Sequence, residues 1–155
     1  MKNPRIAIGA LALSATTLVG IALHEGFEPK AYVPVAGDVP TIGFGTTDSV
    51  KMGDTITVER ALVKLLQDAN KFERAVKRCA PVPMHNYEFA AFVSLAYNIG
   101  EGAFCRSTLV KKLNAQDYAG ACQEILKWDR FKGKPLTGLT KRRQAEYQQC
   151  IGASA

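Results

Sequence analysis

An uncharged run extends from Ile6 to Leu23, preceded by a short start that carries Lys2 and Arg5. A helix over this range would come close to the roughly 30 Å apolar thickness of a bilayer. The run is only weakly apolar, because more than half of it is Ala, Gly, Ser or Thr. The pattern predicts an N-terminal helix over residues 6–23 that tolerates both lipid and water.

Three roles suit such a segment. A cleaved signal peptide would share the basic start, but small residues at cleavage-site spacing are scattered and none stands out after the run. A permanent anchor would ordinarily be more hydrophobic, and a plain buried helix is a further alternative. We favour the third role, a segment that inserts, holds the protein and later leaves the bilayer. The positive residues Lys2 and Arg5 would then stay in the cytoplasm, and everything after His24 would be exported.

A short stretch with strand and turn signals follows, from Tyr32 to Thr47. The residues at 36–38 favour a turn, and residues 41–45 read as a returning strand. Pro40 confines that strand to a sheet edge, since proline has no N–H to donate. This stretch predicts a small β-hairpin.

The rest of the chain has the periodicity of helices. The clearest predicted helix covers about residues 58–78, with Thr57 as its N-cap, and shorter ones are expected at about 85–99, 107–113, 117–128 and 140–150. A loop is expected at 132–135. Apolar residues recur along the first of these helices at Val58, Leu62, Leu65, Leu66, Ala69, Phe72, Ala75 and Val76. The predicted fold class is therefore α+β, mostly α, with one hairpin followed by helices.

The 155 residues fit one domain, or one domain divided into two lobes, and carry a formal net charge of +6. A basic protein is attracted to polyanions such as nucleic acid, anionic lipid or a bacterial envelope. Nucleic acid is the weakest of these partners here, because the basic residues are dispersed and no nucleic-acid-binding motif is present. We interpret the densest cluster, residues 141–143, as the solvated start of a helix.

The four cysteines lack the spacing of metal ligands, and we expect neither a metal nor another cofactor. Export to an oxidising compartment would favour two disulfides. Cys79 and Cys105 flank one predicted helix, so they can meet across it. Cys122 and Cys150 lie on the last two long helices, which we expect to pack antiparallel. These two pairings are favoured over the other two connectivities.

Glu25, followed by a hairpin that ends in Thr-Ile-Gly-x-Gly, resembles the phage-type lysozymes of glycoside hydrolase family 24. Further matches cover nearly the whole exported chain in family order. They are "EGFEPKAY", "TIGFGTT", "SLAYNIGEGAFCRSTLVKKLN", "GACQEILKW" and "GLTKRRQAE". The resemblance implies an endolysin of lysozyme fold that hydrolyses the β-1,4 bond between N-acetylmuramic acid and N-acetylglucosamine in peptidoglycan for host cell lysis.

The weakly apolar N-terminus fused to such a domain resembles the signal-anchor-release endolysins. That resemblance implies a helix over residues 1–24 that first tethers an inactive enzyme in the host inner membrane, with its catalytic domain in the periplasm. The helix would later leave the bilayer and complete the lysozyme domain. That domain, residues 25–155, would comprise a hairpin lobe to about 57, a linking helix to about 78 and a helical lobe. We expect a monomer.

Cleavage of a glycosidic bond needs an acid to protonate the leaving oxygen and a second polar group to manage water or the developing cation. We expect Glu25 to be the acid, because its hairpin frame matches the family. The family pattern places Asp or Cys nine residues after the Glu and Thr six residues later. Thr41 matches the Thr by its context, although it lies one residue further from Glu25 than expected.

The second carboxylate is displaced from the family pattern. Counting from Glu25 leads to Pro34 and counting back from Thr41 leads to Val35, and neither residue is acidic. The hairpin's acid is Asp38, at its turn. Either a lengthened turn brings Asp38 into the cleft, which we favour, or Asp38 is an ordinary turn residue that bonds its own backbone. In the second case Glu25 and Thr41 would carry the reaction, with Thr41 orienting water.

Phe44, Tyr97 and Asn98 are expected to line or support the cleft, and core packing accounts equally well for the two aromatic residues. We interpret His24 as an interfacial residue rather than a base. Two other functions stay open. One is a lytic transglycosylase, which uses one acid and no hydrolytic water. The other is a non-catalytic, membrane-tethered module that binds peptidoglycan and would not need Glu25.

Overall fold

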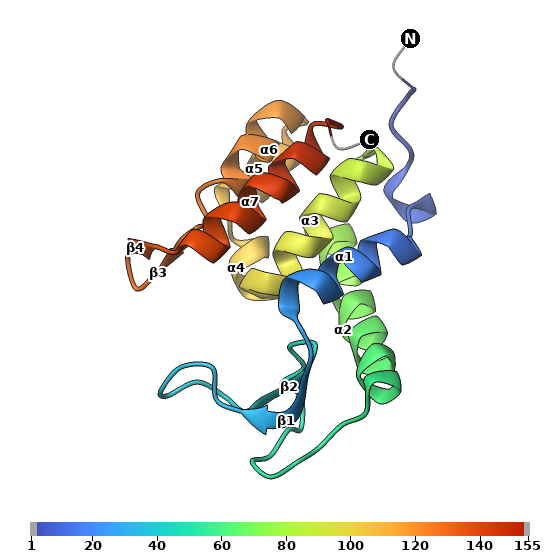
Figure 1. Cartoon of the computed structure of the whole chain (residues 1–155). Helices are drawn as coiled ribbons and strands as arrows, with labels where there is room; N and C mark the ends of the chain where they lie inside the picture. The colour runs from blue at the N-terminus through green and yellow to red at the C-terminus, as the bar shows by residue number, and fades with distance from the viewer. Residues whose placement is uncertain (1–2, 154–155) are drawn as a thin grey trace. The chain divides into compact units, whose positions relative to one another are not determined.

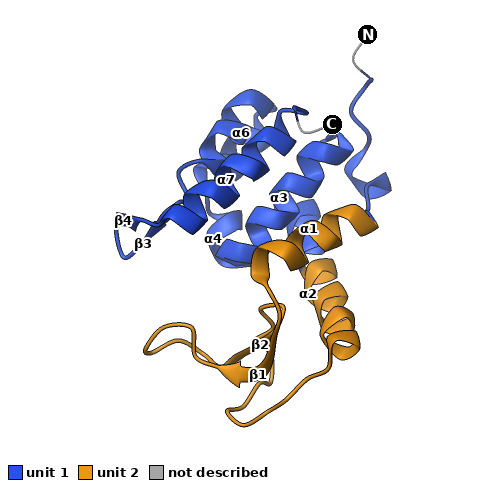
Figure 2. Ribbon diagram, viewed as in Figure 1, with its two compact units in different colours: residues 1–14, 72–155 blue, residues 15–71 orange. Residues whose placement is uncertain are grey.

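The computed structural model describes residues 3–153, which divide into two compact units (Figures 1 and 2). One unit, here called the hairpin unit, comprises residues 15–71. The other, called the helical unit, comprises the chain up to residue 14 and from residue 72 onward. The division falls after residue 14 and after residue 71, whereas the predicted segments were 1–24, about 25–57, about 58–78 and about 79–155.

The hairpin unit contains helix α1 (Ala15–Glu25), strands β1 (Glu28–Tyr32) and β2 (Thr41–Gly43), and the first part of helix α2 (Val58–Cys79). The strands are antiparallel, with Glu28 opposite Gly43 and Tyr32 opposite Thr41, and the register shifts between these pairs. The predicted hairpin is thus confirmed. Its return strand is shorter than expected, because the backbone of Ile42 and Thr46 closes a tight turn with two hydrogen bonds of 2.9 and 3.0 Å.

The continuous helix predicted over residues 6–23 is not formed in the folded structure. A single 3-10 turn, η1 (Ile8–Ala10), precedes α1, which begins only at Ala15. Ile6 instead exchanges backbone hydrogen bonds of 2.9 and 3.0 Å with Met84, and Leu11 is buried in the core of the helical unit. These contacts hold the segment extended, since tertiary pairing and burial outweigh a weak local helix propensity. Within residues 3–153, no helix is both long and apolar enough to span a bilayer.

The helical unit contains the rest of α2 and five further helices. The predicted helices are present, but the one expected at 117–128 ends earlier, at Ile125, and the one expected at 140–150 begins earlier, at Thr137. The predicted loop at 132–135 lies in a small hairpin of strands β3 (Arg130–Phe131) and β4 (Lys134–Pro135). The five helices are α3 (Asn86–Ile99), α4 (Glu101–Cys105), α5 (Thr108–Asn114), α6 (Tyr118–Ile125) and α7 (Thr137–Cys150).

Helix α3 runs through the middle of the helical unit and packs along α7, while α5 packs against α6 (Figure 1). Side-chain caps start the shorter helices: Ser107 accepts the N–H of Val110, and Asp117 accepts that of Gly120. Both predicted disulfides are confirmed. Cys79 is bonded to Cys105 and Cys122 to Cys150, with Cα–Cα distances of 5.4 and 5.7 Å. The bridges tie α2 to α4 and α6 to α7.

The apolar face predicted for α2 is only partly buried. Leu65, Ala69, Ala75 and Val76 are buried as expected, but Val58, Leu62 and Leu66 are exposed. Leu62 and Leu66 line an apolar groove of about 600 Å³ on the hairpin unit, together with Leu18, Val19, Ala22, Leu23, Gly26, Phe27, Phe44 and Leu65. The periodicity therefore identified the correct helix, but part of its apolar face lines an open groove.

The basic cluster at 141–143 is not the solvated helix start that we expected. Arg143 has no exposed surface, and Arg142 is also buried. Both pair with the buried carboxylate of Glu146, with nitrogen–oxygen distances of 3.2 Å for Arg142 and 2.7 Å for Arg143. Ser94 on α3 donates to the same carboxylate at 2.7 Å. A buried carboxylate with several donors can hold two arginines inside a protein, and sequence composition does not reveal such a partner.

Candidate active site

Glu25 is the last residue of α1, at the point where the helix gives way to the hairpin. The N–H of Gly26 bonds to the carbonyl of Ala22 at 2.9 Å, and Gly26 has a φ of +71°. A glycine in this left-handed conformation commonly ends a helix, because other residues meet a steric penalty there. The sequence Glu-Gly therefore places the half-buried Glu25 side chain at a sharply defined helix end.

The second glycine of the motif "TIGFG" lies directly beside the Glu25 carboxylate. A Cβ atom at Gly45 would stand 3.0 Å from Glu25 Oε2, and the φ of Gly45 is +87°. The first glycine, Gly43, has a φ of +65° and lies against Ala61 of α2, where a Cβ would stand 3.0 Å from the alanine Cβ. At both positions a side chain would strain the backbone and push its neighbour away by a few tenths of an ångström. Gly45 thus makes the space that the carboxylate occupies.

The turn that carries Gly45 is braced from two sides. Thr46 donates its hydroxyl to Asp68 Oδ2 on α2 at 2.7 Å, and Thr46 is buried. The ring of Phe44 lies 5.4 Å from that of Phe27, centroid to centroid, at a tilted angle that suits aromatic pairs. The turn is therefore fixed to α2 on one side and to the residues that follow Glu25 on the other.

Thr41 is buried at the start of β2, opposite Tyr32 of β1. Its hydroxyl donates to the carbonyl of Val39 at 3.2 Å. Burial, followed by the charges of Glu28 and Glu25, raises the pKa of Tyr32 above its ordinary value. Tyr32 is thus a neutral hydroxyl group at the loop end of the hairpin, where burial and the charges of Glu28 and Glu25 disfavour its ionisation.

Asp38 lies in the loop of residues 33–40 that the Tyr32–Thr41 pair closes. Its backbone N–H donates to the carbonyl of Val35 at 2.9 Å, and its side chain is exposed. Among the described residues, its carboxylate has no hydrogen bond or ion pair. The predicted turn is present, and Asp38 belongs to the same unit as Glu25 and Thr41.

Tyr97 and Asn98 lie on α3 of the helical unit, whereas Phe44 lies in the hairpin unit. Tyr97 is buried, with its ring 5.3 Å from that of Phe72. Asn98 is exposed, and its side-chain oxygen accepts a hydrogen bond of 2.8 Å from Nη1 of the buried Arg143. Core packing therefore accounts for Tyr97. Asn98 is a surface amide whose orientation is fixed by its hydrogen bond from the buried Arg143.

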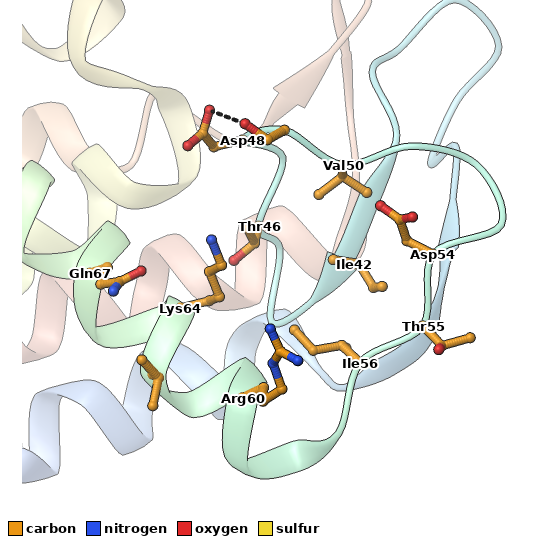
Figure 3. A pocket seen from close by; sticks show the side chains of 12 residues that line it. Ile42, Thr46, Asp48, Val50, Asp54, Thr55, Ile56, Arg60, Lys64 and Gln67 are labelled. Atoms are coloured by element: carbon orange, nitrogen blue, oxygen red, sulfur yellow. Dashed lines mark hydrogen bonds between the residues drawn. The ribbon is translucent and has the colours of Figure 1, made fainter.

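A separate polar pocket of about 470 Å³ lies between the loop after β2 and α2 (Figure 3). Asp48 and Asp54 from the loop and Arg60 and Lys64 from α2 line it. The residues predicted to be catalytic are not among those that line it. The site around Glu25 is therefore distinct from this pocket.

Within residues 3–153, no group of three or more His, Cys, Asp or Glu side chains is placed to hold a metal ion.

Sequence reasoning did not single out Gly45 or Asp68 as parts of the site. The motif contained Gly45, but nothing local showed that its missing Cβ leaves room for Glu25, which is twenty positions earlier in the sequence. Asp68 looked like a polar position of an amphipathic helix. Its position on the buried side of α2, next to apolar Ala69 and Leu65, was the one available signal.

The structure resembles solved lysozyme-type enzymes. An endolysin from Escherichia coli O157:H7 phage FAHEc1 superposes with a TM-score of 0.79 at 38% identity, covering 92% of this chain and 95% of that one. The endolysin of Acyrthosiphon pisum secondary endosymbiont phage 1 is 44% identical over 86% of this chain and 94% of its own length. The SAR-endolysin of Pseudomonas phage phiKMV is 36% identical over 93% of this chain and 91% of its own length.

The fold and the carboxylate at the helix end define a lysozyme-like glycoside hydrolase. The family model described as phage lysozyme matches residues 22–146. That match includes Glu25, the hairpin, α2 and the helical unit from residue 72 to residue 146. The chain belongs to the phage lysozyme family.

Proposed function

We propose that this protein is an endolysin that hydrolyses the β-1,4 bond between N-acetylmuramic acid and N-acetylglucosamine in bacterial peptidoglycan. The observation that carries the proposal is the placement of Glu25, which ends α1 with its carboxylate over the side-chain-free backbone of Gly45. A carboxyl group held by a helix end and a braced turn has the fixed geometry that proton transfer requires. Membership of the phage lysozyme family supports the same reaction.

In this mechanism Glu25 donates its proton to the glycosidic oxygen as the bond to the anomeric carbon breaks. A water molecule adds to that carbon and loses a proton. Because the Thr41 hydroxyl already donates to Val39, its oxygen remains available to accept a hydrogen bond from that water. Asp38 is the second carboxylate, on a loop that starts beside Thr41, and takes up the proton or stabilises the developing cation.

The residues Phe44, Tyr97 and Asn98 complete the proposal on the substrate side. The carbonyl oxygen of Asn98 is engaged by Arg143, so its NH₂ group is the end that can donate to a glycan. Phe44 contributes to glycan binding indirectly, because its ring pairs with that of Phe27 and holds the turn in place. Tyr97 stabilises α3 by packing its buried ring against that of Phe72.

The proposal extends to location. The protein is first tethered in the host inner membrane by residues 6–23, with its catalytic domain in the periplasm, and is then released to act as a monomer. Similarity to a SAR-endolysin over 93% of the chain supports this, together with the weakly apolar run. In the folded conformation described above, residues 3–14 belong to the helical unit. We therefore assign this conformation to the released state.

The enzymatic part is tested with Glu25→Gln on purified peptidoglycan. Because the change removes only the proton donor, activity should fall by at least about a hundredfold with folding intact. Glu28→Gln is the matched control, an exposed carboxylate three residues further on. Equal activity of the two variants would refute the assignment. Reducing sugar ends in the wild-type product support hydrolysis, whereas anhydro ends would establish the transglycosylase.

The tether is tested with Gly9→Leu combined with Gly20→Leu. A Cβ atom added at either glycine would have no other atom within 4 Å, so the folded protein should accept both leucines. In a bilayer, each should add about 1.5–3 kcal/mol of apolar burial. The variant should stay in the membrane fraction and lyse cells late, while its purified form keeps normal activity. Normal release would contradict the tether.

A further inference from the structure

Arg5 is held on several sides in the helical unit. Its Nε and Nη2 atoms donate to the two carboxylate oxygens of Glu88 at 2.9 and 2.7 Å. Its guanidinium carbon lies 3.5 Å from the ring centroid of Tyr118, whose hydroxyl in turn donates to the carbonyl of Pro83 at 2.6 Å. A two-point pair stacked on an aromatic ring is specific to the planar guanidinium group.

Glu88 depends on this partner. It lies in the first turn of α3, is 3% exposed, and accepts the backbone N–H of His85 at 2.8 Å as part of a capping box. That backbone bond satisfies one oxygen, while Arg5 reaches both. Without Arg5 the carboxylate would stay largely buried with a single backbone donor, which is an unfavourable state for a charge.

The chain beyond Arg5 continues into the same unit. Ile6 is bridged to Met84 by two backbone hydrogen bonds, Leu11 is buried in the core, and the N–H of Leu13 donates to Glu73 at 3.1 Å. Arg5 and Glu88 are 83 positions apart, so their contact forms only when this whole segment is in place.

The contact is incompatible with the tethered state. When residues 6–23 lie in the bilayer, Arg5 is on the cytoplasmic side, whereas Glu88 belongs to the exported domain. The pair therefore exists in one of the two states and not in the other. Such a contact shifts the equilibrium toward its own state by its full free energy, whereas a contact present in both states shifts nothing.

We infer that the Arg5–Glu88 pair is a latch that holds the released conformation of the enzyme and opposes return of its N-terminus to the membrane. This inference rests on the proposed tether. In the membrane Arg5 is the charge that marks the cytoplasmic end of the segment. After release the same residue pairs with Glu88, whose carboxylate belongs to the capping box of α3, so one side chain serves each state in turn.

Two substitutions test the latch from its two sides. Arg5→Lys keeps the positive charge that orients the membrane segment but loses the two-point geometry and the stacking. Glu88→Gln leaves the membrane segment untouched and can still accept the N–H of His85. The control is Lys112→Gln, because the Lys112–Glu124 pair has matching exposure, 35% and 8% against 34% and 4%, and lies wholly outside the N-terminal segment.

The measurement is the ratio of periplasmic to membrane-bound protein at a fixed time after induction of the full chain. We expect the ratio to fall at least fivefold for Arg5→Lys and for Glu88→Gln, and to stay within twofold for Lys112→Gln. The double variant should be no worse than the more affected single variant, since each change breaks the same contact. Thermal unfolding of the purified single and double variants should show the same non-additivity.

The first residue of the periplasmic protein distinguishes a wrong latch from a wrong tether. If that protein begins beyond Ala22, both the tether and the latch are wrong. If it is intact and Glu88→Gln is released like wild type, the latch is wrong and the tether stands. Coupling in thermal unfolding without any change in release would also overturn the latch, because the pair would then be only structural.

Discussion

The role of Gly45 can be tested by giving it a side chain. Gly45→Ala places a methyl group 3.0 Å from Glu25 Oε2, in a backbone with a φ of +87°. The substitution therefore has two consequences, backbone strain and displacement of the carboxylate. Gly133→Ala separates them, because Gly133, in the β3–β4 hairpin and outside the site, has a φ of +79° but no neighbouring atom within 4 Å of the added carbon.

The strain should be similar at the two positions. An L-residue in the left-handed region costs about 1–2 kcal/mol. For a protein of this size, that lowers the melting temperature by roughly 2–8 °C. Contact at 3.0 Å is tighter than ordinary carbon–oxygen packing, so in Gly45→Ala the carboxylate must also move by some tenths of an ångström. Because a misplacement of about 1 Å can cost a hundredfold in rate, a displacement of some tenths of an ångström should cost about fourfold to tenfold.

The assay compares the rate of peptidoglycan solubilisation per mole of folded enzyme for the wild type and both variants, at a temperature well below their melting. Gly133→Ala should lose stability but keep its activity, whereas Gly45→Ala should lose both. If the two variants have activities within threefold of one another, the missing side chain of Gly45 does not position Glu25. The geometric argument for the site would then be refuted.

Two further predictions concern carboxylates. Asp38→Asn should lower activity by much more than threefold if Asp38 is the second catalytic group; a smaller change, worth less than about 0.7 kcal/mol, would assign it to the turn alone. Hydrogen bonds from Lys112 and Lys127 hold the pKa of Glu124 below its ordinary value of 4.5, so its stabilising effect is complete above that pH and is lost as the pH falls through the lowered pKa. Glu124→Gln should therefore lower the free energy of unfolding by about 2 kcal/mol at pH 7 and progressively less below pH 4.5, and a pH-independent loss in denaturant titrations would contradict this.

The helices and the hairpin could be predicted from the sequence because their signals are local. The apolar period of α2, the caps Ser107 and Asp117, and the turn residues around Gly37 act within a few positions of the chain. Both disulfide pairings followed from the same order of elements. Glu25 was predicted to be the acid from its motif, and the structure shows the helix end and the glycine beside its carboxylate.

Other features were decided only by the tertiary structure. Residues 6–14 have the composition of a helix, yet the folded chain buries Leu11 and pairs Ile6 with Met84. Arginine is a residue type that is usually exposed, yet Arg143 lies in the core, where it forms an ion pair with Glu146. In both cases the deciding partner comes from another element, and burial or charge pairing with it outweighs local preference. Periodicity and capping depend on residues within a few positions of one another, so they can be read from the sequence. A buried ion pair or a docked segment depends on groups that only folding brings together.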